Sequence, residues 1–285
     1  EPQRAGEEFP VYLSMFGDFE GSGCGVYSGF NDFAPVKVNV EYLEPVANNS
    51  KRLKIRQNGE YRDILLSQQT IDVQFTDGQA TVLMRYDDVG KIKVQFTMEV
   101  TTGDGSEIIV GGSTLPFVIK PYDVQFSKVY VERNLQEVSP HNWSNTETDP
   151  QYSFANGTFF QKAGEPFVIH LKPVNKLGAA VQNYGRESVP QGFSVTSELL
   201  SPMMGDNGSQ GDGTMRSGDI FERKYDFESS DYVFVNDKIA FDEVGYIRLV
   251  AHARGLNYLD AGDIVTTPSP AIGRFTPDHF DVELV

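Results

Sequence analysis

Apolar and polar residues alternate with a period of two through much of the chain. One face of the run after Gly90 is apolar and consists of Ile92, Val94, Phe96, Met98 and Val100. Residues 71–75 alternate in the same way, and the turn sequence Thr76–Gln79 separates them from a returning strand. Such alternation predicts strands with one buried and one solvent-facing side. No stretch carries a convincing long helical stripe, so the pattern predicts an all-β fold.

The sequence repeats itself. The run YDDVGKI (86–92) returns as FDEVGYI (241–247), an offset of 155 residues. The run PFVIKPYDVQF (116–126) is paralleled by GRFTPDHFDVEL (273–284), and Phe117 and Phe275 are 158 residues apart. Two matches in the same order at nearly the same offset predict two tandem modules of about 155 residues.

The repeated run has a structural interpretation. In immunoglobulin-like sandwiches, an acid-x-Gly/Ala-x-Tyr sequence turns the chain from strand E into strand F. These three places are occupied by Asp88, Gly90 and Ile92 in the first copy and by Glu243, Gly245 and Ile247 in the second. Isoleucine replaces tyrosine, so the hydrogen bond of a tyrosine corner is absent. We therefore predict two tandem immunoglobulin-like β-sandwich modules, residues 1–120 and 121–285.

The two modules join almost without a linker. The first copy passes directly into the second, and Pro121 stiffens the joint. By analogy, the same joint follows the second copy and contains Arg274, Pro277, Asp278 and His279. We expect a rigid, elongated rod, with the alternating residues 280–284 forming a strand at a seam to a further module.

Asp278 and His279 are also candidates for acid–base chemistry. No Gly-x-Ser-x-Gly or Cys–His pairing suggests a nucleophile to accompany them. A structural role at the joint is the favoured interpretation. His141, His170 and His252 are scattered and lack metal-ligand spacing. The sequence therefore predicts no catalytic residues, no metal site and no cofactor.

Composition narrows the function classes. The net charge of −16 opposes binding to phosphate backbones, so we expect no nucleic-acid partner. Cys24 is the single cysteine, which excludes an intrachain disulfide and a cysteine-rich zinc site. No apolar run approaches the roughly 20 residues of a membrane-spanning helix, so we expect no membrane insertion by this segment.

Two polar stretches interrupt the strand pattern, and long loops on a β-scaffold often carry binding function. Residues 134–153 contain Trp143, the single tryptophan and our candidate ligand-binding residue. Residues 201–219 are glycine-rich around Gly205 and carry Asp206 and Asp212. The spacing of these acids is not that of an EF-hand, so it favours a plain loop over a calcium site.

Three stretches resemble the C-terminal region of MshQ-type proteins, which belong to the biogenesis locus of the mannose-sensitive haemagglutinin (MSHA) pilus, a type IV pilus of Gram-negative bacteria. They are KAGEPFVIHLKPVNKLGAAVQNY (162–184), FDEVGYIRL (241–249) and GRFTPDHF (273–280). The resemblance implies an exported protein at the cell surface or pilus. Its partners would be other modules of the same longer protein, pilus components or surface glycans.

Three functions remain open at this point. The first is a non-catalytic stalk that presents a binding end. The second is a direct glycan- or protein-binding module that uses the loops around Trp143 and Gly205. The third is an enzyme of unrecognised type, for which no acid, base and nucleophile set is visible. We expect the first.

Overall fold

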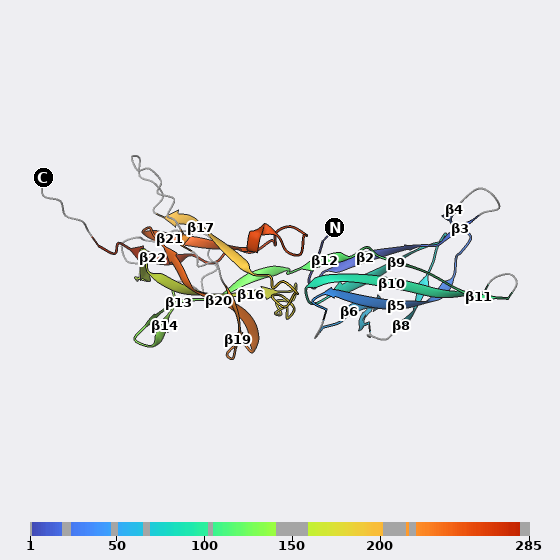
Figure 1. Cartoon of the computed structure of the whole chain (residues 1–285), viewed down its shortest axis with the longest axis horizontal. Helices are drawn as coiled ribbons and strands as arrows, with labels where there is room; N and C mark the ends of the chain where they lie inside the picture. Colours follow the sequence, from blue (N-terminus) through green and yellow to red (C-terminus); the bar gives the residue numbers. More distant parts are fainter. Residues whose placement is uncertain are drawn as a thin grey trace. The chain divides into compact units, whose positions relative to one another are not determined.

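The computed structural model divides the chain into two compact units (Figure 1). Unit 1 comprises Glu1–Pro121 together with Asn175–Pro190, and unit 2 comprises Tyr122–Val174 together with Gln191–Val285. The structure describes residues 2–18, 24–46, 51–64, 69–101, 105–140, 159–201, 215–216 and 221–279. Apart from one short 3₁₀ turn, η1 (Arg254–Leu256), the regular elements of these residues are β-strands, which confirms the all-β prediction.

Unit 1 contains two main sheets and a small hairpin. The first sheet has the order β1 (Gln3–Arg4), β12 (Phe117–Lys120), β10 (Gly90–Thr101), β5 (Phe33–Glu44) and β8 (Gln69–Gln74), with β11 (Glu107–Ser113) also on β10. The second has the order β2 (Glu8–Ser14), β9 (Gln79–Tyr86), β6 (Leu53–Gln57) and β7 (Glu60–Asp63), and the hairpin pairs β3 (Phe16–Asp18) with β4 (Cys24–Val26). Alternate residues of β5, β9 and β10 are buried, as their period-two pattern predicts.

Unit 2 also contains two main sheets. The first has the order β15 (Gln161–Lys162), β22 (Ile272–Thr276), β21 (Gly245–Ala253) and β17 (Phe193–Ser201). The second has the order β14 (Gln136–Val138), β13 (Asp123–Arg133), β16 (Pro166–Val174), β20 (Asp231–Phe241) and β18 (Met215–Arg216), with β19 (Glu222–Asp226) also on β20.

The predicted repeat is present in the strand plan. The short strands β1 and β15 each pair in parallel with the last strand of their unit, β12 and β22 respectively. A hydrogen bond from a strand N–H to a side-chain hydroxyl also recurs, at the offset of 155 residues. The Val94 N–H donates to Thr114 Oγ1 at 3.0 Å, and the Leu249 N–H donates to Ser269 Oγ at 2.9 Å. The two units are thus copies of one fold.

A further part of the repeat was not recognised in the sequence. The run QRAGE (3–7) returns as QKAGE (161–165), at an offset of 158 residues. Gly6 and Gly164 both have a left-handed backbone, with φ of +80° and +79°. This match aligns β2 with β16 residue by residue.

The same aromatic pair anchors both cores. The rings of Phe9 and Phe117 lie 5.6 Å apart in unit 1, and those of Phe167 and Phe275 lie 5.6 Å apart in unit 2. Each member of the first pair is 158 residues before its counterpart in the second. In unit 2 the pair belongs to a larger aromatic cluster, since Phe160 and Phe241 also contact the Phe275 ring.

One segment of the second repeat belongs to unit 1. The crossover segment, Asn175–Pro190, leaves β16, packs within unit 1 and then returns to β17. The main chain therefore passes between the units three times, after residues 121, 174 and 190. The predicted division of the chain into domains of residues 1–120 and 121–285 stays a prediction.

Candidate functional site

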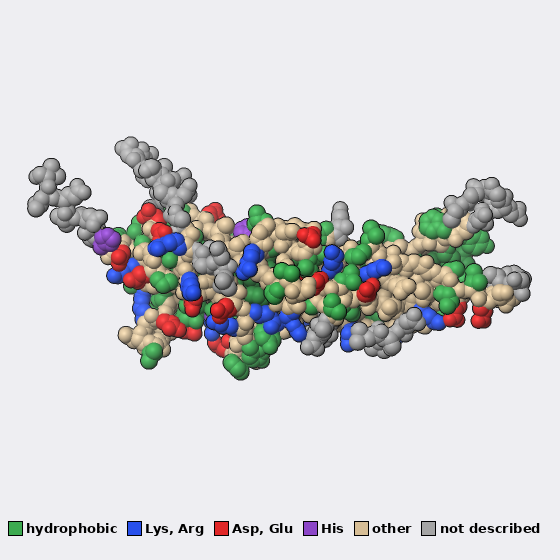
Figure 2. Space-filling model, in the orientation of Figure 1, with side chains coloured by type: hydrophobic (Ala, Val, Ile, Leu, Met, Phe, Trp, Pro, Cys, Tyr) green, Lys and Arg blue, Asp and Glu red, His purple; other side chains and the backbone are tan. Residues whose placement is uncertain are grey.

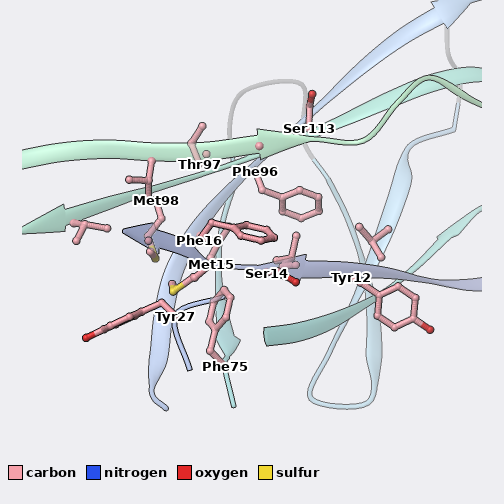
Figure 3. Close-up of a pocket in the computed structure, with 18 of the residues that line it drawn as sticks. Tyr12, Ser14, Met15, Phe16, Tyr27, Phe75, Phe96, Thr97, Met98 and Ser113 are labelled. Atoms are coloured by element: carbon pink, nitrogen blue, oxygen red, sulfur yellow. The ribbon is translucent and has the colours of Figure 1, made fainter. Parts of the chain in front are cut away.

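An apolar groove opens in unit 1 between the β2–β3 side and the β10–β11 side of the sandwich. Its volume is about 620 Å³. The described residues that line it are apolar, aromatic or small and polar, with no Asp, Glu, His, Lys or Arg among them. Figure 3 shows Met15 and Phe16 on one side, with Phe96 and Met98 opposite. This chemistry suits the binding of an apolar or extended ligand better than proton transfer.

The groove follows from how burial changes along β2. Phe9 is 3% exposed, whereas Val11 and Leu13, which share its inward face, are partly exposed. On the opposite wall Phe96 is buried, Met98 is partly exposed and its cross-strand partner Val110 is exposed. The inward faces of the two sheets therefore lose contact with each other toward the ends of these strands.

Exposed aromatic side chains surround the groove. Tyr12 is 75% exposed, Phe16 67% and Tyr27 45%. Figure 2 shows hydrophobic side chains gathered over β3 and β4 at this end of unit 1. Large exposed apolar patches bordered by polar residues commonly mark interaction sites. None of these residues was singled out in the sequence, where Trp143 drew attention instead.

A second notable site is the polar centre beneath the crossover segment. Asp88 is fully buried, and its Oδ1 accepts hydrogen bonds from the backbone N–H groups of Val89, Gln182 and Asn183 at 2.9, 2.9 and 3.0 Å. Burial raises the pKa of Asp88, against the opposing effect of these donors and of Lys51. The carboxylate thereby ties the β9–β10 turn to the crossover segment.

The neighbouring residue Asp87 behaves in the opposite way. Burial alone would raise its pKa, but Lys54 at 2.7 Å and Arg85 at 2.9 Å outweigh burial and hold the pKa below its usual value. The Asp87 carbonyl accepts a hydrogen bond from Asn175 Nδ2 at 3.1 Å. Both acids of the turn are therefore engaged in holding the fold together.

The predicted turn glycines both have positive φ, +139° for Gly90 and +118° for Gly245. A Cβ at Gly90 would lie 2.1 Å from the Glu44 carbonyl oxygen, so a side chain cannot be placed there without moving the backbone. Pro121, which follows β12 in the chain, is buried. Gly90 pairs with Ile119 of β12 and Gly245 with Phe275 of β22, so each turn glycine lies beside the last strand of its unit.

The structure brings Asp278 and His279 together with Lys162, all on the surface. Asp278 Oδ1 pairs with Lys162 Nζ at 3.1 Å, and Asp278 Oδ2 lies 3.3 Å from His279 Nδ1. The Lys162 hydrogen bond, followed by His279, lowers the pKa of Asp278. Pro277 is exposed beside them. In β22, the Arg274 carbonyl accepts a hydrogen bond from the Phe160 N–H.

Several other predicted residues cannot be placed. Trp143, His141, Gly205, Asp206 and Asp212 lie outside the described residues, as does the side chain of Cys24. Within the described part of the chain, no group of three His, Cys, Asp or Glu side chains is arranged to hold a metal ion. The same part contains no helix long and apolar enough to cross a membrane.

The two remaining histidines lie on strands of different sheets in unit 2. His170 is partly buried in β16, and burial lowers its pKa. His252 in β21 contacts Asp263 at 2.8 Å and Thr196 at 3.1 Å. Neither is among the residues that line the groove.

The chain aligns with a solved structure. A crystal structure of invasin, described as a bacterial integrin-binding protein, aligns over 97% of this chain at 13% identity, with a TM-score of 0.28. The chain spans 37% of the length of that invasin chain. A comparison with curated proteins gave no match.

Comparison with protein families covers most of the chain. Residues 1–112 match the first Ig-like domain of DUF6701, a domain of unknown function. Residues 139–231 match the second DUF6701 domain, and residues 243–285 match the third. The first match, together with the strand plan of both units, confirms the immunoglobulin-like fold class. Strand pairing joins β17 to β21 and β15 to β22 across the last two matches, so both contribute strands to unit 2. The chain is thus built from DUF6701 domains.

Proposed function

We propose that this chain is a non-catalytic, adhesive or structural segment of a bacterial cell-surface or pilus-associated protein. Its repeated sandwiches form the scaffold, and the groove of unit 1 is its binding surface. The main support for this proposal is the groove, which is open, apolar and bordered by the exposed residues Tyr12, Phe16 and Tyr27. A surface of this kind binds by contact area and shape, without acid–base groups.

The exported, pilus-associated location rests on the resemblance of residues 162–184 and 273–280 to MshQ-type proteins. In this proposal the partners are other modules of the same longer protein, pilus components or surface glycans. The rigid, elongated arrangement expected from the sequence remains a prediction, and small-angle scattering of the purified chain would measure it.

Binding of the purified chain to glycan arrays and to bacterial and host-cell surfaces tests the proposal. The test variant is the double substitution Tyr12→Ser and Phe16→Ser, which removes two exposed rings from the groove rim. The matched control is Leu256→Ser, an exposed apolar residue in unit 2 that is 59% exposed. We expect surface binding that the double variant loses and the control keeps. Binding that is unchanged in the double variant would contradict a role for the groove.

The second candidate function places binding in the loops around Trp143 and Gly205. The notable feature is the single tryptophan within a polar stretch, since sugars stack on aromatic rings. Loss of glycan binding in Trp143→Ala, with the Tyr12 and Phe16 variant unaffected, would favour this alternative.

A further inference from the structure

The repeat gives the groove of unit 1 a counterpart in unit 2. At the offset of 158 residues set by QRAGE and QKAGE, Phe9, Val11 and Leu13 of β2 correspond to Phe167, Ile169 and Leu171 of β16. Both strands pair on one side with the equivalent strand, β9 in unit 1 and β20 in unit 2. The other edge of β2 can therefore be compared directly with the other edge of β16, because the two strands are equivalent parts of two copies.

That other side is covered in unit 2. Strand β13 pairs antiparallel with β16, from Tyr130 opposite Val168 to Asp123 opposite Val174. Its buried residues include Val124, Phe126, Val129 and Val131. With β13 in place, Ile169 and Leu171 are completely buried.

The same side is open in unit 1. Among the described residues, β9 is the sole strand partner of β2. Val11 and Leu13, the counterparts of Ile169 and Leu171, are partly exposed and line the groove. The groove residues 11–16 correspond to residues 169–174, which pair with β13 in the other copy. In the described part of unit 1, the groove thus lies at the position that β13 occupies in unit 2.

We propose that the groove of unit 1 binds an extended polypeptide strand that adds antiparallel to β2 from Val11 onward. The occupant has the pattern of β13, with large apolar side chains at alternate positions that fill the space between β2 and β11. Its backbone pairs with the free edge of β2, and its apolar residues contact Leu13, Phe96 and Met98. Pro10 has no N–H to donate, so the pairing begins after it.

The chain itself indicates where such a strand comes from. Strand β13 follows β12, the last strand of unit 1, after Pro121 and Tyr122, and completes unit 2. The strand that leaves one module therefore completes the sandwich of another. The partner of the groove is accordingly a strand that follows a neighbouring module of this repeat type. This inference rests on the proposed function, because it specifies what the binding surface holds.

A labelled peptide with the sequence of β13, residues 123–133, tests the proposal against the full chain. We expect saturable binding by fluorescence anisotropy. A peptide with Val124→Asn, Phe126→Asn and Val129→Asn should bind at least about tenfold more weakly, because it cannot fill the groove. Equal binding of the two peptides, or no binding of either, would overturn the proposal.

Two chain variants act from opposite walls of the groove. Leu13→Arg and Met98→Arg each place a charge where an apolar side chain must pack, and both sites are partly exposed, so we expect the fold to survive. Each should weaken peptide binding at least about tenfold. The control is Ile109→Ser in β11, which is 73% exposed and does not line the groove. Unchanged affinity in both arginine variants, with circular dichroism matching the parent chain, would overturn the proposal.

Three further experimental outcomes distinguish this proposal from its alternatives. Self-association of the chain that competes with the peptide, seen by light scattering, would identify a second copy as the strand donor and overturn the assignment to a neighbouring module. Saturable glycan binding in the groove that excludes the peptide would overturn a polypeptide occupant. Peptide binding without surface adhesion would contradict the proposed adhesive function and leave the strand site intact.

Discussion

Units 1 and 2 are two copies of one sandwich, and they differ along the edge of β2 and its counterpart β16. In unit 2, β13 covers β16 and buries Ile169 and Leu171 completely. In unit 1, the counterpart edge of β2 has no such strand among the described residues, and an apolar groove of about 620 Å³ lies there. A sandwich that lacks one strand keeps its core where the remaining strands meet, and exposes apolar surface where the strand would lie. The difference shows how a structural repeat can leave an open apolar groove at one of its copies.

A second difference concerns the repeated turn. Asp88 of unit 1 is fully buried and accepts three backbone N–H groups, two of them from the crossover segment. Its counterpart Glu243 is partly exposed, and its Oε1 accepts the adjacent Val244 N–H at 2.8 Å. The same turn therefore holds a neighbouring segment in one copy and stabilises mainly itself in the other.

The largest expected effect is on the free energy of unfolding, and it differs between the Phe9–Phe117 and Phe167–Phe275 pairs. Phe275→Ala should destabilise unit 2 by roughly 3–5 kcal/mol, because the ring is fully buried among three other phenylalanines. Phe117→Ala should cost unit 1 less, because the Phe117 ring is partly exposed. Chemical denaturation of the two variants gives the comparison. A larger loss for Phe117→Ala would show that the two cores are not equivalent in the way we describe.

The second effect compares the turns. Asp88→Ala leaves the buried N–H groups of Val89 and Asn183 and the part-buried N–H of Gln182 without their acceptor, and each buried group costs about 1–3 kcal/mol. Glu243→Ala should change the free energy of unfolding by less than about 1 kcal/mol, because its carboxylate is partly exposed. Proteolysis should also cut the crossover segment faster in Asp88→Ala than in the parent chain. Equal losses at the two turns would refute the distinction between them.

The third effect is the pH dependence of unit 1, to which the two acids of the turn contribute with opposite signs. The pKa of Asp88 is raised in the folded chain, so its contribution is fully present below its unfolded pKa and is lost as pH rises through the folded value. The pKa of Asp87 is lowered, so its contribution is present above its unfolded pKa and is lost as pH falls.

Asp88→Asn isolates the first contribution, since the amide oxygen can still accept the backbone N–H groups. Relative to this variant, the parent chain should lose stability as pH rises from about 4 toward neutrality. Melting curves of both proteins across this range measure the difference. A parent chain that gains stability relative to the variant would show that the Asp88 pKa is lowered by its donors.

The smallest expected effect is at the predicted joint. Lys162, Asp278 and His279 form ion-pair contacts at the surface, where water and salt weaken charge interactions. Asp278→Asn should leave the melting temperature of unit 2 unchanged within error. A clear drop would assign these residues the structural role that the sequence suggested.

The sequence predicted much of the scaffold and little of the groove. Alternation after Gly90 and the two acid-x-Gly turns were enough to predict strands and a tandem repeat, because local pattern determines which face of a strand is buried. The groove lies beside β2, which among the described residues has no partner equivalent to β13, and this difference is visible only when β2 is aligned with β16. The match of QRAGE with QKAGE would have supplied that alignment. The packing of the crossover segment within unit 1 was equally beyond local pattern, because Asp88 and Asn183 are distant in sequence.

Hydrogen exchange of the backbone amides in β2 and β16 is the most direct test of the central claim. We predict that β16 amides are protected in the chain alone, whereas those of Val11–Ser14 that point away from β9 exchange fast. Adding the β13 peptide should slow exchange in Val11–Ser14 and leave β16 unchanged. Slow exchange in β2 without peptide, or protection that appears elsewhere when the peptide binds, would contradict the open strand site.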